Sequence, residues 1–141
     1  DTGEAIISIH QNYADAILAG TKTVELRRRF PVLSAGTRLW VYATRPTSAV
    51  VGYVTILDVH RATPETIWKR HRIGTGVDYA AFRDYFSGAP EAVAILLTSA
   101  RRVRPIGLDG LRRIRDCFHP PQVLTHLTES EAEALRALAE K

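Results

Sequence analysis

The sequence has few of the residues from which cross-linked, metal-bound or membrane-spanning proteins are built. Its 141 residues include a single cysteine, Cys117, so no disulfide forms within the chain and the cytoplasm is the expected setting. Five scattered histidines and one cysteine give no zinc-site spacing, and we expect no metal and no cofactor. No apolar run is long enough to cross a bilayer or to form a signal peptide, so no membrane association is predicted.

Acidic residues are outnumbered over most of the chain. There are 19 Lys+Arg against 15 Asp+Glu, a net charge of +4. Residues 129–141 hold four acids and two bases, so the preceding residues carry 17 bases and 11 acids. Short basic runs lie at 27–29, 69–72, 101–104 and 112–115. This surplus favours a polyanionic partner such as nucleic acid, while an ordinary basic domain fits the same numbers.

The chain shows no internal repeat, low-complexity tract or linker, which predicts one domain over residues 1–141. Apolar patterns predict strands at about 5–10, 23–28, 37–44, 49–60 and 92–99, with a continuation to 104. Helices are predicted after residue 12, from 64 to 72, after 78, over 108–114 and over about 129–140. Residues 37–44 are apolar on both faces, so this strand is expected to be central. The pattern predicts an α+β domain on a curved sheet or small barrel of about five strands with short flanking helices.

Single residues predict several boundaries. Asn12 is expected to cap the first helix and Gly20 to end it. Gly52 inside a predicted strand indicates a bulge or a close backbone approach. Thr128 and Glu131 have the spacing of a capping box at the start of the last helix.

Residues 20–29, GTKTVELRRR, place many charges on a segment with strand alternation. Glu25 and Arg27 are two residues apart, so they share one face of the strand and can pair. An exposed pair contributes about 0–1 kcal/mol and means little. A buried pair costs desolvation, which makes a functional reason more attractive. Lys22 can reach a phosphate, although many surface lysines simply follow helix C-termini.

The same stretch resembles a known family. Gly20 to Arg27 matches G-x-K-x-x-E-x-R, the signature of the ASCH domains, which belong to the PUA-like superfamily of small mixed barrels. Segments outside the signature are also similar to this family or to a longer ASCH subfamily described as predicted regulators: residues 8–18, 42–44, 50–52, 75–88 and 120–122. The sequence departs from many relatives at Gln11, where they have proline.

The resemblance implies a basic cleft that binds RNA, DNA or a nucleotide, including a single-stranded, flipped or modified base. A carboxylate such as that of Glu25 accepts from the cytosine amine, and arginine or lysine donates to base acceptors. An unpaired base stacks on an aromatic ring. The predicted ligand-binding residues are Lys22, Glu25, Arg27, His10, Tyr42, Thr44 and Trp68.

Two other function classes stay open. The family resemblance also implies small hydrolases, either a metal-independent ribonuclease using Lys22, Arg27 and His10 or an N-acylcytidine amidohydrolase using Lys22, Glu25 and Thr23. In amidohydrolase members a threonine lies three residues after the signature lysine, where this chain has Glu25, which weakens that alternative. The third class is the ligand-sensing module of a transcriptional regulator, although no helix-turn-helix pattern is present. The residues favour binding over catalysis.

Overall fold

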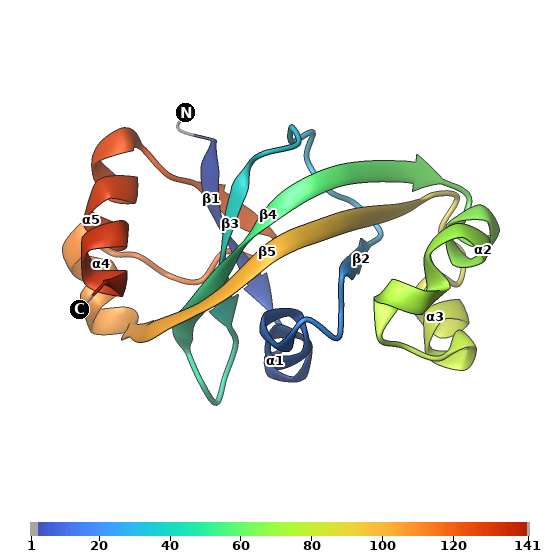
Figure 1. Cartoon of the computed structure of the whole chain (residues 1–141), viewed down its shortest axis with the longest axis horizontal. Helices are drawn as coiled ribbons and strands as arrows, with labels where there is room; N and C mark the ends of the chain where they lie inside the picture. Colours follow the sequence, from blue (N-terminus) through green and yellow to red (C-terminus); the bar gives the residue numbers. More distant parts are fainter. Residues whose placement is uncertain (1–2, 141) are drawn as a thin grey trace.

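Two long antiparallel strands organise the fold, and the shorter elements lie along them (Figure 1). The computed structural model describes residues 3–140; residues 1, 2 and 141, which the single-domain prediction includes, lie outside the described residues. The elements are β1 (Glu4–Ile9), α1 (Gln11–Ala19), β2 (Val24–Arg27), β3 (Arg38–Ala43), β4 (Ala49–Ala62), α2 (Pro64–Thr75), α3 (Tyr79–Tyr85), β5 (Ala92–Gly107), α4 (Leu108–Ile114), β6 (Leu124–His126) and α5 (Glu129–Ala139). Figure 1 shows α4 and α5 at one end of the β4–β5 ribbon and α2 and α3 at the other.

The strands form one six-stranded sheet in the order β2-β5-β4-β3-β1-β6. β1 and β3 are parallel, whereas the other neighbouring pairs are antiparallel. The predicted α+β architecture is confirmed, and β3 is central, as expected from its two apolar faces. The sequence prediction omitted β6, because a strand of three residues is too short to show an alternating pattern. Within residues 3–140, none of the helices has the length and apolar character of a bilayer-spanning segment.

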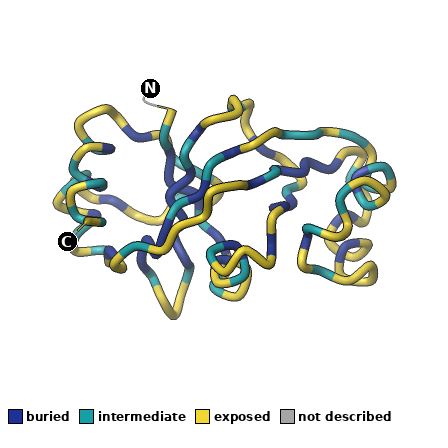
Figure 2. The backbone as a smooth tube through the Cα atoms, viewed as in Figure 1, coloured by how far each residue is buried: buried dark blue, intermediate teal, exposed yellow. Residues whose placement is uncertain are grey.

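Apolar side chains are buried on both faces of the central strands, and Figure 2 shows the buried backbone concentrated where these strands meet. In β3, Leu39 and Val41 belong to a core shared with α1, while Trp40 and Tyr42 belong to a second core shared with α4 and α5. A third core joins β2 and the adjoining part of β5 to α2 and α3. This third core holds α2 and α3 against the strand that carries the charged motif.

Local signals set most of the boundaries. Gly20 ends α1 with a φ of 84°, as predicted. The prediction of Asn12 as the cap of α1 is wrong: the cap is His10, whose ring Nδ1 accepts from the backbone N–H of Asn12 at 3.3 Å. Histidine is not among the preferred capping residues, which is why sequence preference chose Asn12. A register shift lies at Gly52, where a Cβ would lie 2.5 Å from the carbonyl oxygen of Arg101, so the predicted irregularity is confirmed.

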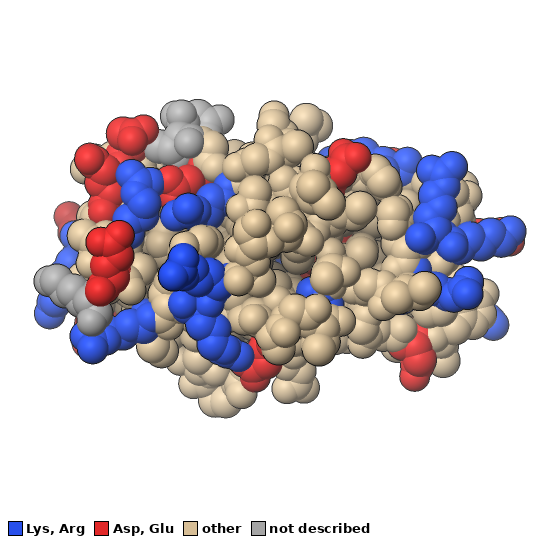
Figure 3. Space-filling model, in the orientation of Figure 1, with Lys and Arg blue, Asp and Glu red and all other residues tan. Residues whose placement is uncertain are grey.

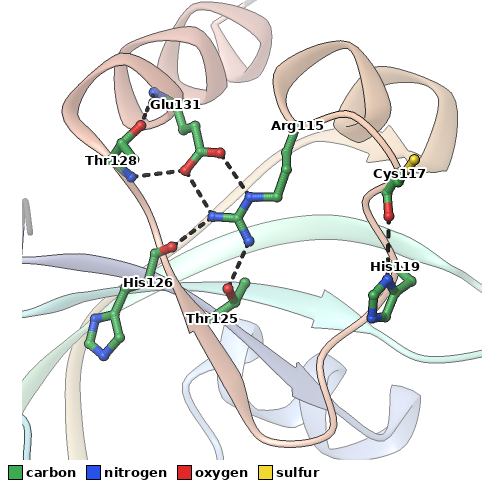
Figure 4. Close-up of polar contacts among 7 residues, drawn as sticks. All are labelled: Arg115, Cys117, His119, Thr125, His126, Thr128 and Glu131. Carbon is green, nitrogen blue, oxygen red and sulfur yellow. Dashed lines mark hydrogen bonds and ion pairs between the residues drawn. The ribbon is translucent and has the colours of Figure 1, made fainter.

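Arg115 at the end of α4 connects three elements (Figure 4). Its Nε and one terminal nitrogen each lie 2.8 Å from a carboxylate oxygen of Glu131 on α5. The guanidinium also donates to the Thr125 hydroxyl at 2.7 Å and to the His126 carbonyl at 2.8 Å, both on β6. Glu131 accepts from the backbone N–H of Thr128 at 2.9 Å, which completes the predicted capping box. The cluster therefore fastens α4, β6 and α5 together.

We expect Glu131 to make the stability of the fold sensitive to acid. Hydrogen bonding from Arg115 lowers the pKa of Glu131 from 4.5 to about 2. A carboxyl group with a lowered pKa stabilises the folded state above its unfolded pKa, and this contribution is lost as the pH falls from 4.5 toward 2. Glu131→Gln should lower the unfolding free energy by about 1–3 kcal/mol near neutral pH, measured by urea unfolding.

The exposed Glu133 on the same helix supplies the matched control. Glu133→Gln removes the same charge without touching Arg115, so its unfolding free energy should stay within about 0.5 kcal/mol of the wild type. An equal loss in the two variants would contradict a specific role for the Arg115–Glu131 pair.

Candidate functional site

A cavity of about 280 Å³ brings the charged motif together with the start of α1 and with α3. Its polar wall is formed by Ser8, His10, Lys22, Glu25 and Arg27, and its aromatic and aliphatic wall by Tyr13, Leu26, Val77, Ala81, Phe82 and Tyr85. Four of the predicted ligand-binding residues therefore line one cavity, although they come from the end of β1, from the turn after α1 and from β2.

Lys22 is buried, with only 2% of its surface exposed. Its Nζ donates to the carbonyl oxygen of Thr75, lies 3.6 Å from Oε1 of Glu25 and sits 4.9 Å from the ring centroid of Tyr13. Burial lowers the pKa of Lys22, and the neighbouring Glu25 carboxylate opposes this without reversing it. The amine therefore gives up its proton more readily than an exposed lysine does.

The end of α2 packs directly on the segment that carries Lys22. The backbone N–H of Thr23 donates to the carbonyl of Gly74 at 2.9 Å. A Cβ at position 74 would lie 2.5 Å from Oγ1 of Thr23 and 2.8 Å from Cγ2 of Val24, closer than real Cβ atoms approach. Glycine at this position therefore allows α2 to present the Thr75 carbonyl to Lys22.

Glu25 is held between two cationic side chains. Arg27 Nε donates to Oε2 of Glu25 at 2.9 Å, and a terminal nitrogen of Arg27 donates to the carbonyl of Ser8 at 2.9 Å. The side chains of Glu25 and Arg27 are 8% and 15% exposed, so the pair is largely removed from water. These contacts fix the guanidinium plane and still leave N–H donors of Arg27 for a ligand.

The mouth of the cavity carries an exposed imidazole and two exposed phenol rings. His10 is exposed, and because its Nδ1 accepts from the Asn12 backbone, Nε2 is the nitrogen that remains for a ligand. Tyr13 and Tyr85 are 40% and 44% exposed, and the ring of Tyr13 lies 6.0 Å from that of His10. The mouth therefore offers both a proton-exchanging group and surfaces on which a base can stack.

The other predicted site residues lie outside this cavity. Tyr42 is 2% exposed and packs beside Phe118 in the core under α4 and α5. Side chains alternate along β3, and Tyr42 therefore points to the face of the sheet opposite α1. Trp68 packs against Phe82 on the side of α2 that faces α3. Thr44 follows β3 and is half-buried, and the exposed Thr23 is not among the lining residues.

Seven lining residues were not among the predicted site residues: Ser8, Tyr13, Leu26, Val77, Ala81, Phe82 and Tyr85. Of these, Val77 lies in the turn that joins α2 to α3, and Tyr85 is the last residue of α3. The buried stripe of α3 includes Phe82 and continues to Phe86, and Tyr85 falls outside it. A large aromatic residue outside the buried stripe of its helix was the available signal, because exposed tyrosine rings are enriched at binding surfaces.

The basic runs do not all converge on this cavity. Figure 3 shows Lys and Arg side chains gathered toward the two ends of the face, near α4 and α5 and over α2 and α3, with few charges between them. Some are paired, as in Lys69 with Glu65 at 3.6 Å and Arg102 with Asp15 at 3.2 Å. Among residues 3–140, no group of three or more His, Cys, Asp or Glu side chains is arranged to hold a metal ion.

Comparison with known proteins shows the family of the chain. The family model described as ASCH domain matches residues 7–107, which contain every residue of the cavity wall and most of the sheet. The chain belongs to the ASCH family. In this ASCH protein, the signature residues Lys22, Glu25 and Arg27 are the ones that meet in the cavity.

Individual relatives match almost the whole ASCH chain. A Zymomonas mobilis protein named ASCH domain-containing ribonuclease is 41% identical over 138 residues, covering 98% of this chain and 93% of that protein. The crystal structure of ASCH from Zymomonas mobilis superimposes with a TM-score of 0.94 at 40% identity, covering 98% and 96% of the two chains. The N-terminal domain of Staphylothermus marinus McrB, at 12% identity and a TM-score of 0.61, covers 96% of this chain and 94% of that one and shares the fold.

Proposed function

We propose that this ASCH protein is a ribonuclease that takes one nucleotide of single-stranded RNA into the cavity and cleaves the adjoining phosphodiester. The observation that carries the proposal is the meeting of the buried Lys22, the Glu25–Arg27 pair and the exposed His10 around one small cavity. The name of the 41% identical relative from Zymomonas mobilis supports RNA as the substrate.

The size and lining of the cavity suit one unstacked nucleotide. Its volume of about 280 Å³ lies near the lower end of small-ligand pockets and is too small for a duplex. The rings of Tyr13 and Tyr85 offer stacking surfaces for a base. Arg27 is held in plane by Glu25 and by the Ser8 carbonyl, so it meets a phosphate with little loss of side-chain freedom.

The groups in the cavity can support internal transesterification. Lys22, whose pKa is lowered by burial, accepts the proton of the ribose 2′-hydroxyl, and the 2′-oxygen then bonds to phosphorus. Arg27 stabilises the negative charge that develops on the phosphoryl oxygens. The bond from phosphorus to the 5′-oxygen breaks, and His10 returns a proton to that oxygen. The products are a 2′,3′-cyclic phosphate and a 5′-hydroxyl.

Three labelled single strands of one sequence test this function: RNA, DNA and 2′-O-methyl RNA. We expect cleavage of RNA with cyclic phosphate ends, because only RNA has the attacking hydroxyl. The 2′-O-methyl strand should bind within about tenfold of RNA and stay intact, since its bases and phosphates are unchanged. Cleavage is followed on denaturing gels, and affinity by fluorescence anisotropy.

Two results would reject the proposal. Cleavage of the 2′-O-methyl strand at the RNA rate would exclude attack by the 2′-hydroxyl. Absence of any RNA cleavage would leave a binding protein, the function that the sequence favoured. Cleavage activity that coincides with the protein peak on gel filtration excludes a contaminating nuclease of a different size.

A further inference from the structure

We propose that the groove beside the cavity is a second subsite, which holds the next nucleotide of the same RNA strand and its phosphate. This inference rests on the proposed function, because it extends the substrate from one nucleotide to at least two.

The groove adjoins the cavity directly. It has a volume of about 520 Å³ and is lined by Arg27, Arg28, Arg29, Tyr85, Ala89, Pro90, Glu91 and Val123. Arg27 and Tyr85 line both the groove and the cavity, so these two side chains form the shared wall. A strand that leaves the cavity across this wall enters the groove.

The groove carries positive charge in a defined position. One terminal nitrogen of Arg28 donates to the backbone carbonyls of Tyr85 and Ser87, at 2.9 and 3.2 Å, which holds the guanidinium against the end of α3. Arg29 is exposed, and it forms no ion pair with any residue in the described part of the chain. Glu91 is the one carboxylate in the lining. The surplus of cations suits a phosphate.

The groove also has an apolar wall on which a base can rest. Tyr85 is 44% exposed, and its ring packs on that of the buried Phe86, with the centroids 4.7 Å apart and an interplanar angle of 73°. Val123, 37% exposed, and Pro90 continue this surface. A cationic groove with stacking surfaces is the usual design for a single strand, because every base has a face that can stack.

A second basic hollow on the molecule provides the control. It is lined by Arg38, Arg101, Arg102 and Arg136, together with Trp40, Tyr53, Val103, Ala139 and Glu140, and it shares no lining residue with the cavity or the groove. Arg101 is exposed, as Arg29 is, so Arg101→Gln removes the same charge at a site that is not continuous with the cavity. Both substitutions lie at the surface, and we expect each to change stability by no more than about 0.5 kcal/mol.

The experiment compares Arg29→Gln and Arg101→Gln by titration with a nucleoside 3′-monophosphate and with a ten-nucleotide RNA at several salt concentrations. We expect Arg29→Gln to weaken binding of the ten-nucleotide RNA by about 3–10-fold and to reduce the slope of log affinity against log salt by about 1. Its affinity for the mononucleotide should equal that of the wild type, and Arg101→Gln should match the wild type for both ligands.

Each other outcome overturns a different statement. Equal weakening of RNA binding by Arg29→Gln and Arg101→Gln would mean general attraction without a subsite. Weaker binding of the mononucleotide by Arg29→Gln would place Arg29 in the cavity itself and would contradict the inference of two subsites. Failure of the wild type to bind either ligand would instead reject the proposed function, on which the subsite rests.

Discussion

Lys22→Met is expected to reduce RNA cleavage to the level of the buffer control and to weaken RNA binding, while the protein stays folded. The substitution removes the amine that accepts the 2′-hydroxyl proton, and the Arg27 guanidinium cannot replace it because arginine does not release its proton. The cavity keeps Tyr13, Tyr85 and the Glu25–Arg27 pair, so its shape is retained. Single-turnover cleavage and fluorescence anisotropy with the non-cleavable strand measure the two effects.

The fold should tolerate this change for a physical reason. Methionine is unbranched and apolar, so it fills the space of the lysine stem and removes the cost of burying an amine. Glu25 keeps its contact with Arg27 at 2.9 Å, so no carboxylate is left alone. We therefore expect an unfolding free energy within about 1.5 kcal/mol of the wild type.

Glu25→Gln is the contrasting variant in the same experiment. It removes the carboxylate shared by Lys22 and Arg27, and the two cations then lie in a largely buried wall without their acid. Breaking a buried pair in this way costs about 3–5 kcal/mol. A Lys22→Met protein that cleaves RNA at the wild-type rate would refute the role given to Lys22. A Lys22→Met protein as unstable as Glu25→Gln would refute the expectation that the fold tolerates methionine at this position, and its loss of cleavage would then say nothing about the chemistry.

His10→Asn is expected to lower the cleavage rate by about 10²–10⁴-fold, the usual contribution of a general acid. Asparagine is a good helix cap, so it can replace the acceptor that His10 Nδ1 provides to the Asn12 N–H. It cannot deliver a proton to a leaving oxygen. Affinity for the 2′-O-methyl strand should stay within about threefold of the wild type, because the phosphate and base contacts belong to other residues.

His10→Ala separates the two roles of this residue. It loses the cap as well as the imidazole, and we expect it to lower the unfolding free energy by about 1 kcal/mol relative to His10→Asn. The two variants should be equally slow in cleavage when compared at a temperature where both are folded. Wild-type cleavage by His10→Asn would show that another group protonates the leaving oxygen.

The charged motif was predictable from the sequence because its geometry is local. Strand alternation alone puts Glu25 and Arg27 on one face, and the structure joins them at 2.9 Å. The burial of Lys22 was not predictable in this way, because a lysine after a helix is normally exposed. It follows from the contact with the Thr75 carbonyl, 53 residues away, which requires the packing of α2 against β2.

The aromatic residues show more clearly what sequence alternation does not predict. Alternation in β3 correctly separates Trp40 and Tyr42 from Leu39 and Val41, but it does not say which face of the sheet carries the cavity. Tyr42 was chosen as a ligand-binding residue and lies in the core opposite α1. Tyr85 was passed over, although it stands in the shared wall of the cavity and the groove. Position across a sheet is set by the packing of helices, which single-strand patterns do not encode.

The hydrogen bond from Lys22 to the Thr75 carbonyl at the end of α2 makes the amine a probe of how α2 is docked on the sheet. The Thr75 carbonyl that holds it belongs to a unit whose apolar contacts are made with β2 and the adjoining part of β5. A separation of residues 63–90 from that edge would expose the amine to water and remove the burial that lowers its pKa. Because Lys22 is buried, an amine-selective reagent would modify it only after such a separation, so its modification would report on the docking of α2 and α3 without any RNA in the sample.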